Sequence, residues 1–544
     1  MPRPMRRIPP ARAMIVAPQP EAVEAGAAVL AAGGNAMDAT LACAFTQGVV
    51  DPMMCGLGGL GVMTVHDPRS RAQIVFDGLS PCPAAAHEAM WAHLFERECT
   101  DGYGFVLKGA PNEVGRASVT VPSILRTFAE AHGAFGRLPW RDLFAGAIAC
   151  AREGWMVRPH VHMMMTADER AYGRVNIADK LAHTPDAARL YLRADGTPKR
   201  PGERVVNEDL AATLETIARD GADAFYTGEI ARRIAADMAA HGGLVTAADL
   251  AAVQARRVAP LRVPYRGRTL VLPPPPAGGI FVGEVLRILE HFDLPGMGHN
   301  SPAMIAVLAE ALKRAGLDKD RHVGDPDFVD IPLDRLLSDA YAADCAACIK
   351  AGERASLARA GAEPKGTTTI SCVDRDGMVV SVTHTLGMPS GVVPPGLGFM
   401  LNGAMNWYDP RPGRATSIAP GKRRFSSMSP LIVMEGEEPV ATLGAPGGAW
   451  IGVALAQVLV NLLDFGMGIQ EAVLAPRISA TSETLDLSLR IPRAAEAALR
   501  ADGYRVKRVP ATYAFAGVHG IAMWDGLLEG AADPQRDGYA AGIA

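Results

Sequence analysis

The segment over residues 366–386 constrains this chain most, because it predicts a β-hairpin. Two apolar, β-branched runs, residues 368–373 and 379–385, have the composition of buried strands. Between them, residues 374–377 read Asp-Arg-Asp-Gly, and an Asp-Gly pair is a strong signal for a tight turn. The hairpin follows Gly366 directly, so Thr367 stands at the head of its first strand.

Thr367 has two interpretations. Threonine is a common strand residue whose hydroxyl usually satisfies a neighbouring backbone group. Alternatively, Thr367 is an N-terminal nucleophile that is released when the bond after Gly366 is cut. Its new α-amine, with a pKa of about 7.7–8.0, could then take the proton from its own hydroxyl. The hairpin by itself favours the structural interpretation, so the rest of the chain has to decide.

The composition is that of a globular enzyme without a nucleic-acid partner. Of 544 residues, 49% are hydrophobic and 21% are charged, which allows a large core. The net charge of −4 gives no electrostatic basis for binding nucleic acid. No apolar run has the length of a signal peptide or of a membrane-spanning helix, so we expect no membrane partner and a cytoplasmic location.

The cysteine and histidine patterns indicate no metal site and no cofactor. The eight cysteines are scattered through apolar segments, so we expect free, mostly buried thiols. Cys345 and Cys348 form a C-x-x-C motif, but it lies in an alanine-rich helical pattern without a second pair. His160 and His162 have no further ligand at a recognisable spacing.

Two glycine-rich stretches need separate interpretations. Residues 56–61 match G-x-G-x-x-G, but they follow a helix and open a strand, the reverse of a dinucleotide site, so we expect close backbone packing there. Residues 445–448 read Ala-Pro-Gly-Gly between a strand and a helix over 451–465. Free N–H groups at a helix N-terminus suit an oxyanion, although an ordinary turn has the same pattern.

The remaining patterns alternate between helices and short strands, which predicts an α+β fold of one structural domain. We expect helices over 20–49 (with a turn at 33–35), 123–132, 140–153, most of 186–265, up to 291 after a proline-rich bend at 273–279, and onward to 359. We expect further strands at 62–66, 73–76, 270–272, 431–433 and 441–448. Residues 361–365 are polar and are expected to be exposed, where a chain can be cut without unfolding.

Short motifs follow one another along nearly the whole chain. They lie at 24–26, 33–39, 56–61, 136–140, 242–250, 273–279, 367–385, 426–430, 446–448 and 532–538. With these motifs in this order, the chain resembles the γ-glutamyltranspeptidase family of N-terminal nucleophile hydrolases. The resemblance reverses the interpretation of Thr367 in favour of a nucleophile.

The resemblance implies a four-layer αββα sandwich made from a self-cleaving precursor. The Thr367 hydroxyl would attack the carbonyl of Gly366, and this would yield two tightly associated pieces, 1–366 and 367–544. A pair of such pieces could itself form a dimer.

The resemblance also implies the parts of an active site. Thr385 matches a second threonine that hydrogen-bonds the nucleophile. Gly447 and Gly448 match the paired glycines that bind the oxyanion. Ser426 and Ser427 match the serine pair that holds a substrate carboxylate.

The substrate-binding positions depart from the family pattern. Asp77 stands where glutamyl-specific members have an arginine for the substrate α-carboxylate, which inverts the charge there. Gly387 replaces an asparagine, while Ala404 and Trp407 replace the glutamine and the acidic residue that hold the substrate ammonium. We therefore expect an amidohydrolase that forms an acyl-enzyme on Thr367 from a small amide whose acyl group is not free γ-glutamyl.

Two alternatives stay open at this point. A true γ-glutamyl hydrolase or transferase for glutathione-like donors would need a substitute cation, and Lys422, Arg423 and Arg424 lie near Ser426 in sequence. A chain that never processes would be a non-catalytic binding protein, although retention of Thr367 and its partners argues against this.

Overall fold

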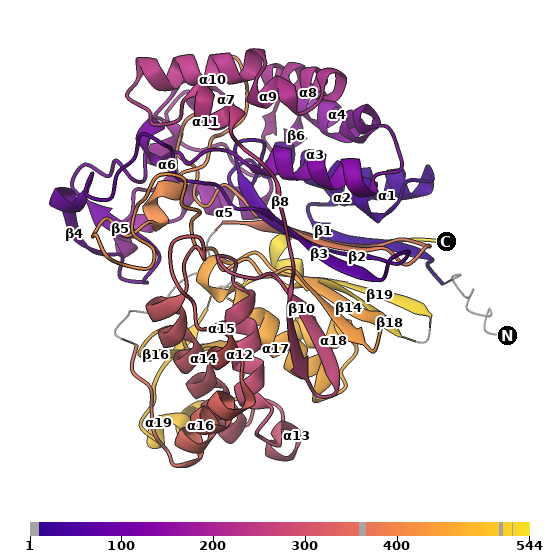
Figure 1. Cartoon of the computed structure of the whole chain (residues 1–544), viewed down its shortest axis with the longest axis vertical. Helices are drawn as coiled ribbons and strands as arrows, with labels where there is room; N and C mark the ends of the chain where they lie inside the picture. Colours follow the sequence, from indigo (N-terminus) through magenta and orange to yellow (C-terminus); the bar gives the residue numbers. More distant parts are fainter. Residues whose placement is uncertain (1–9, 358–365, 511–514, 525) are drawn as a thin grey trace.

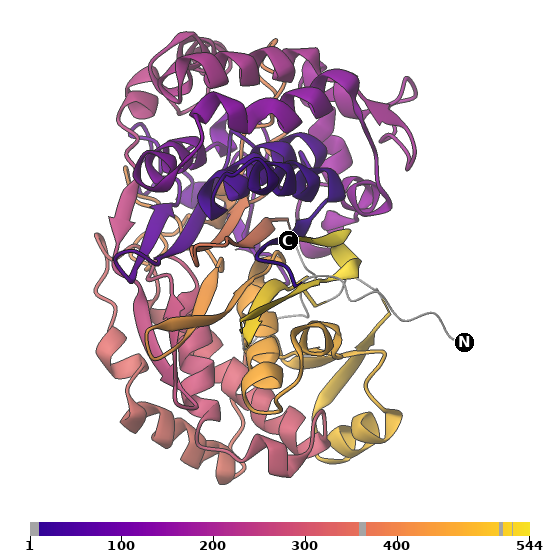
Figure 2. The ribbon, with the colours of Figure 1, turned by 90° about the vertical axis from the view of Figure 1, so that its right-hand side faces the viewer.

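The molecule is a sandwich of two β-sheets between two layers of helices. The computed structural model describes residues 10–357, 366–510, 515–524 and 526–544. Figure 1 shows the two sheets lying face to face across the middle, with helices above and below them. Figure 2, turned by 90°, shows the same separation into layers. This confirms the predicted α+β class and the four-layer αββα arrangement.

The first sheet contains the predicted hairpin at its centre. It has seven strands in the order β20-β1-β11-β12-β2-β3-β8, and every neighbouring pair is antiparallel. Its strands are β1 (Ala13–Pro18), β2 (Leu60–Asp67), β3 (Ala72–Gly78), β8 (Arg256–Val258), β11 (Thr368–Val373), β12 (Val379–Thr385) and β20 (Gly538–Ile543). Strands β11 and β12 begin and end where the sequence predicts, because the Asp-Gly turn fixes their register.

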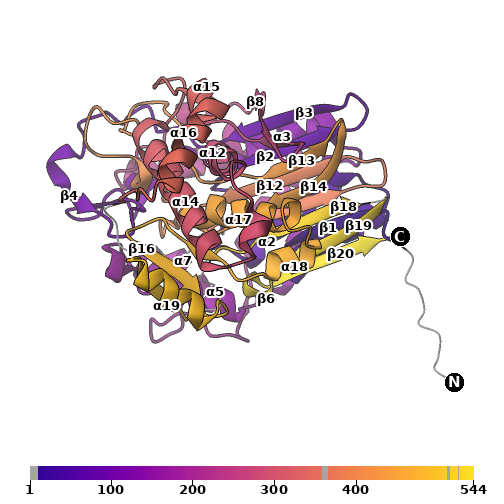
Figure 3. The same ribbon diagram turned by 90° about the horizontal axis from the view of Figure 1, so that it is seen from below.

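The second sheet has six strands in the order β19-β18-β14-β13-β10-β9. They are β9 (Leu261–Tyr265), β10 (Arg268–Leu272), β13 (Leu431–Glu435), β14 (Glu438–Gly444), β18 (His519–Trp524) and β19 (Leu527–Ala532). Figure 3, seen from below, shows that the strands of the two stacked sheets run in roughly the same direction.

The two sheets are joined by an apolar core and by the path of the chain. Buried side chains from both inner faces form one cluster: Met14, Val16, Val373 and Val379 from the first sheet, and Val271, Ile432, Met434 and Ile521 from the second. Each sheet also mixes strands from before and after residue 366. A cut at that position would therefore leave two interlocked pieces.

One helical layer covers the outer face of the first sheet. Its main helices are α1 (Pro20–Ala31), α2 (Ala36–Val50), α3 (Ile124–Phe135), α4 (Ala145–Glu153), α8 (Glu208–Asp220) and α10 (Glu229–Ala240). The predicted turn between the first two helices ends at Asn35, whose side chain accepts a hydrogen bond from the N–H of Asp38 in a reciprocal capping box. Helix α2 is buried along nearly its whole length, which places it directly on the sheet.

The other helical layer covers the second sheet. Its main helices are α12 (Gly279–Leu289), α14 (Pro302–His322), α16 (Asp339–Lys350), α17 (Ile451–Leu463) and α19 (Arg493–Ala501). The smaller helices of the molecule are α5 (Pro159–Thr166), α6 (Ile177–Leu181), α7 (Pro185–Tyr191), α9 (Asp223–Tyr226), α11 (Ala247–Ala251), α13 (Leu294–Met297), α15 (Leu333–Leu336) and α18 (Ile469–Leu474). Short strands outside the two sheets are β4 (Phe95–Glu98), β5 (Phe105–Leu107), β6 (Trp155–Met156), β7 (Arg204–Val205), β15 (Ile478–Ser479), β16 (Thr484–Ser488) and β17 (Arg505–Val509).

The structure corrects two stretches of the predicted secondary structure. The helices expected onward to 359 end with α16 at Lys350, and residues 351–357 are not helical. The mostly helical pattern over 186–265 is right up to α11, but β8 and β9 follow it and form one edge of each sheet. Edge strands carry few buried side chains, so their apolar pattern is weak. The predicted exposed segment 361–365 lies outside the described residues.

The cysteines and the helices give two further results. All eight cysteines are free and most of them are buried, as the sequence predicts. Among the described residues, no helix is long and apolar enough to cross a membrane.

Two buried histidines make the stability of the fold depend on pH. Burial lowers the pKa of His384 and of His519 to about 3, and Arg536 adds to the effect at His519. The unfolded chain, with a histidine pKa of about 6.5, binds more protons than the folded chain between these values. The stability is therefore present above pH 6.5 and is lost as the pH falls, by about 2 kcal/mol per histidine at pH 5.

Urea unfolding of the His384→Gln variant at pH 7 and pH 5 tests this dependence. Glutamine keeps a donor for the side-chain oxygen of Gln47, which accepts from His384 Nε2 at 2.9 Å. We expect the loss of stability between pH 7 and pH 5 to be smaller in the variant by about 2 kcal/mol. An equal loss in both proteins would show that His384 is not held neutral.

Candidate active site

Thr367 sits at the head of β11, at the centre of the first sheet, and only 3% of it is exposed. Its hydroxyl donates a hydrogen bond to Thr385 Oγ1 at 3.1 Å, across the hairpin. The backbone N–H of Gly387 donates to the same Thr385 oxygen at 2.8 Å. The Thr367 oxygen therefore keeps its lone pairs available, as a nucleophile requires.

The backbone of Thr367 is strained. Its φ angle is +130°, a region that β-branched residues rarely adopt. Such a conformation costs roughly 1–3 kcal/mol and persists only where the surroundings enforce it. The strain lies next to the Gly366–Thr367 peptide bond, and cutting that bond would release it.

Arg536 is one of the groups that enforce this conformation. It lies at the end of a short 3₁₀ helix, η7 (Pro534–Arg536), is fully buried, and donates to the carbonyl oxygen of Thr367 at 2.6 Å. Asp51 is also buried, and its carboxylate lies 3.5 Å from Arg536. Burial raises the pKa of Asp51 to about 7, with Arg536 opposing the shift. Arg536 lies in the C-terminal motif at 532–538, and no local pattern in the sequence indicates its role.

The predicted oxyanion glycines form the turn between β14 and α17. Gly447 and Gly448 have φ angles of +139° and +57°, and a Cβ on Gly447 would lie 2.4 Å from that of Ala516. Gly448 begins the 3₁₀ helix η6 (Gly448–Trp450), which continues into α17. N–H groups at the start of a helix have no intrahelical acceptor, so they are available for an oxyanion.

Most of these groups meet in one small cavity, but Gly447 is not among the described residues that line it. Its described lining consists of Tyr103, Thr367, Thr385, Gly387, Trp407, Arg424, Ser426, Ser427, Met428, Gly448 and Ile451. The structure thus brings together most of the site residues predicted from sequence. A neighbouring cavity of about 480 Å³ shares Tyr103, Trp407 and Ser427 with it, so the nucleophile has room for a substrate beside it.

Two predicted substrate positions lie outside this lining. Ala404 is fully buried, and its Cβ would be 3.5 Å from a Cβ built on Gly387, so it supports the wall of the cavity from behind. Asp77 is not among the described residues that line either cavity. The structure places it in an ion pair with Arg423, which favours a structural role over the substrate-binding role predicted from the sequence.

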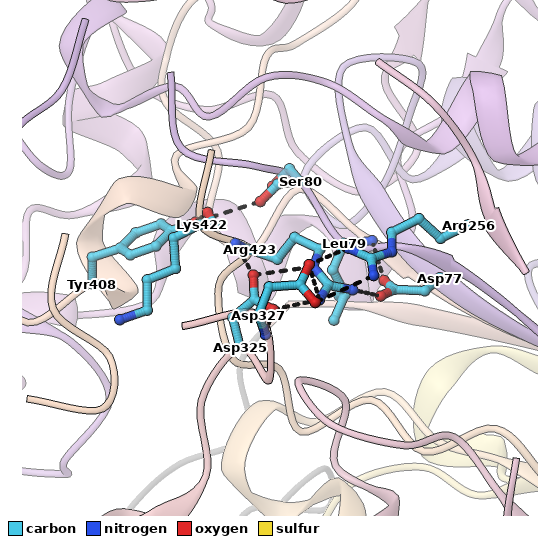
Figure 4. A network of polar contacts seen from close by, with 9 residues as sticks. All are labelled: Asp77, Leu79, Ser80, Arg256, Asp325, Asp327, Tyr408, Lys422 and Arg423. Atoms are coloured by element: carbon cyan, nitrogen blue, oxygen red, sulfur yellow. Dashed lines mark hydrogen bonds and ion pairs between the residues drawn. The ribbon is translucent and has the colours of Figure 1, made fainter. Parts of the chain in front are cut away.

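Asp77 and Arg423 belong to a buried polar network (Figure 4). Arg423 binds both Asp77 and Asp325, and its Nη2 lies 3.3 Å from Asp327. The N–H of Leu79 donates to the second oxygen of Asp77 at 2.9 Å. Burial lowers the pKa of Arg423, but its carboxylate partners outweigh burial and raise it. The network ties the end of β3 to the segment before β13.

The three candidate cations therefore have different positions. Arg423 is committed to its carboxylates, and the ammonium of Lys422 lies over the ring of Phe328 at 5.6 Å from its centroid. Only Arg424 of the three lines the cavity that holds Thr367. All three are candidates from the sequence, which does not indicate which of them lines the cavity.

Other residues considered as nucleotide-binding or metal-binding candidates make packing contacts in the protein interior. Residues 56–61 pack closely, since a Cβ on Gly59 would lie 2.4 Å from the carbonyl oxygen of Thr385. His160 lies against Arg536 in the protein interior. In the described part of the chain, no group of three or more His, Cys, Asp or Glu side chains could hold a metal ion.

Comparisons with known proteins agree with this geometry. A family model described as gamma-glutamyltranspeptidase matches residues 22–543. The chain is 38% identical over 541 residues to the acylase ACY 1 proenzyme of Pseudomonas sp. (strain SE83), covering 98% of this chain and 94% of that protein. It is 34% identical over 547 residues to the glutathione hydrolase proenzyme of Pseudomonas aeruginosa, covering 96% and 93%. Among solved structures, cephalosporin acylase from Bacillus halodurans matches with a TM-score of 0.86 and 28% identity, covering 99% and 98% of the two chains.

Proposed function

This chain belongs to the γ-glutamyltranspeptidase family, and from that premise we propose that it removes an acyl group other than free γ-glutamyl from a small amide. It is a self-processing amidohydrolase with an N-terminal threonine nucleophile. The open question is therefore the acyl group that it accepts.

Self-processing uses the strained end of β11. Thr367 Oγ attacks the carbonyl carbon of Gly366, the C–N bond breaks, and the nitrogen takes the hydroxyl proton. Water then hydrolyses the resulting ester, which leaves a carboxylate on Gly366 and a free α-amine on Thr367. The interlocked sheets keep the pieces 1–366 and 367–544 together.

Turnover repeats this chemistry on a bound amide. The α-amine of Thr367 takes the proton of its own hydroxyl, and the oxygen attacks the substrate carbonyl. The N–H groups of Gly447 and Gly448, in the turn before α17, stabilise the negative charge that develops on the carbonyl oxygen. The amine product leaves with the proton, and water then releases the acid from the ester on Thr367.

One observation carries the proposal on the acyl group: among the described residues that line the nucleophile cavity, none is an aspartate or a glutamate. A γ-glutamyl group brings an ammonium next to its carboxylate, and this cavity offers the ammonium no counter-ion. The carboxylates that line the neighbouring cavity already have cation partners: Glu98 and Asp409 pair with Arg411, Asp101 with Arg174 and Asp320 with Lys319. Trp407 occupies the position of the acidic residue in the glutamyl-specific pattern. Burying an unpaired charge is costly, so a zwitterionic acyl group fits poorly.

The similar proteins support the same choice. The acylase proenzyme shares 38% identity with this chain, while the glutathione hydrolase proenzyme shares 34%. A solved structure that matches over 99% of this chain is that of a cephalosporin acylase. These names describe the relatives and not this chain. For this chain, the higher similarity to acylases favours an acylase.

The test compares two p-nitroanilides that differ only in the ammonium: the γ-glutamyl anilide and the 4-carboxybutanoyl anilide, which is the same acyl chain without the amine. We expect kcat/KM to be about 10- to 100-fold higher for the second, because a charged contact is worth roughly 1.5–3 kcal/mol. Faster release of nitroaniline from the γ-glutamyl compound would reject the proposal in favour of a glutathione-type hydrolase or transferase.

We also propose a cytoplasmic location, and the eight free cysteines support a reducing compartment. A dimer of the processed pairs, and the absence of nucleic-acid and membrane partners, stay predictions. Gel filtration of the processed protein would test the first of these.

A further inference from the structure

Two buried N–H groups in the nucleophile cavity have no hydrogen-bond acceptor among the described residues. They are Nη1 of Arg424 and Nε1 of Trp407. Both side chains line the cavity, and Arg424 is only 3% exposed. Its guanidinium lies over the indole ring, with Cζ 4.2 Å from the ring centroid. Buried donors are nearly always paired in native structures, so two unpaired ones at the same place indicate a ligand.

The two donors converge on the space beside Gly387. A Cβ at that position would lie 2.7 Å from Arg424 Nη1 and 3.6 Å from Trp407 Nε1. With φ at +71°, Gly387 leaves this space open, whereas a larger residue would push the guanidinium away. The N–H of Gly387 binds Thr385, the partner of Thr367, so the space adjoins the nucleophile.

Arg424 also differs from three other buried arginines in that it has no carboxylate partner among the described residues. Arg174, Arg423 and Arg477 each form an ion pair with a buried carboxylate. Arg424 forms no ion pair with any residue in the described ranges, and burial lowers its pKa to about 10 while Tyr103 and Tyr408 oppose the shift. A guanidinium that is buried without a counter-ion is costly, and an anionic ligand would remove that cost.

We propose that Arg424 and Trp407 form a subsite for one carboxylate, located at the far end of the acyl chain that Thr367 attacks. The substrate class is then an amide of a short dicarboxylic acid without an α-ammonium. The chain is short because Thr367, Gly387 and Arg424 line the same small cavity. A guanidinium and an indole N–H together match the two oxygens of a carboxylate, and Ser426 and Ser427 stand beside them. This inference rests on the proposed acylase function.

The test measures the preference for a carboxylate as a ratio of two kcat/KM values, for the 4-carboxybutanoyl and the uncharged pentanoyl p-nitroanilides. We expect the unmodified protein to prefer the first by roughly 10- to 100-fold, the usual effect of a charge-assisted hydrogen bond. In Arg424→Gln the ratio should fall to near 1. In Trp407→Phe, which keeps a ring and loses the N–H, it should fall by a smaller factor. An unchanged ratio in Arg424→Gln overturns the subsite.

Three controls distinguish loss of the carboxylate subsite from misfolding of the variant. Arg141→Gln removes an arginine whose side chain is 76% exposed and should leave the ratio unchanged. Self-cleavage reports folding and nucleophile geometry, and if Arg424→Gln fails to cleave, Arg424→Lys should cleave and keep part of the preference. A lysine variant that cleaves but has lost all preference would overturn a charge-based role.

Binding of free glutarate to the processed protein distinguishes this inference from the proposed function. If the unmodified protein hydrolyses neither anilide, the proposed function fails. Calorimetry would still show glutarate binding that weakens about 10- to 100-fold in Arg424→Gln if the carboxylate subsite is correct. Equal binding by both proteins would reject the subsite even if the anilides are hydrolysed.

Discussion

Replacing Thr367 with alanine should leave a single uncut chain of 57.3 kDa that hydrolyses no amide. The variant lacks the oxygen that attacks Gly366, so it cannot form the ester that precedes cleavage. It also lacks the nucleophile for turnover, and removal of a nucleophile from a comparable acyl-transfer enzyme costs roughly 10⁶ in kcat. Intact mass after incubation, followed by the anilide assay, measures both losses.

Thr367→Ser is the matched control, because it keeps the hydroxyl and removes only the methyl group. It should cut itself between positions 366 and 367 and retain measurable turnover. Two fragments from the alanine variant would show that another group performs the cleavage. Turnover by its uncut chain would show that Thr367 is not the nucleophile.

The conformation of Thr367 gives a physical reason for the position of the cut. The strained φ angle of +130° lies at the peptide bond that must break, and the chain holds it from two sides. Arg536 binds the Thr367 carbonyl oxygen, and Thr385 accepts from the hydroxyl. The same two contacts would orient the free N-terminus after cleavage, so one set of contacts serves both reactions.

The sequence predicted the parts of the fold that depend on local signals. The Asp-Gly turn fixed both strands of the central hairpin, and the Gly-Gly-Asn turn separated α1 from α2, because each signal acts within a few residues. The edge strands β8 and β9 were missed because they have no strong apolar alternation and are held by pairing with distant strands.

The site was predictable where a motif carries the chemistry and not where long-range contacts decide. Thr367, Thr385 and Gly448 meet as expected. The ion-pair partner of Asp77, Arg423, lies 346 residues away, and no local pattern reveals an ion pair over that distance. The choice of Arg424 over its neighbours likewise required coordinates, since adjacent residues of the segment before β13 point into different environments.

The ion pair between Asp77 and Arg423 leads to a different expectation from a substrate-binding role. Arg423→Met should destabilise the protein by about 3–5 kcal/mol, because it leaves Asp77 and Asp325 buried without their cation. All three residues are at most 6% exposed, so water cannot replace the lost contacts. The midpoint of urea unfolding, measured with the processed protein, should fall accordingly.

Asp77→Asn separates stability from binding. If Asp77 held substrate, this variant would raise KM and leave the unfolding midpoint unchanged. The network in Figure 4 predicts the reverse: the midpoint falls, since Arg423 loses one of its charged partners, and KM for the preferred anilide stays the same. Arg232→Met, which removes an arginine whose side chain is 73% exposed, should change the stability by less than about 0.5 kcal/mol. A raised KM in Asp77→Asn at an unchanged midpoint would return Asp77 to the substrate site and with it the interpretation made from sequence.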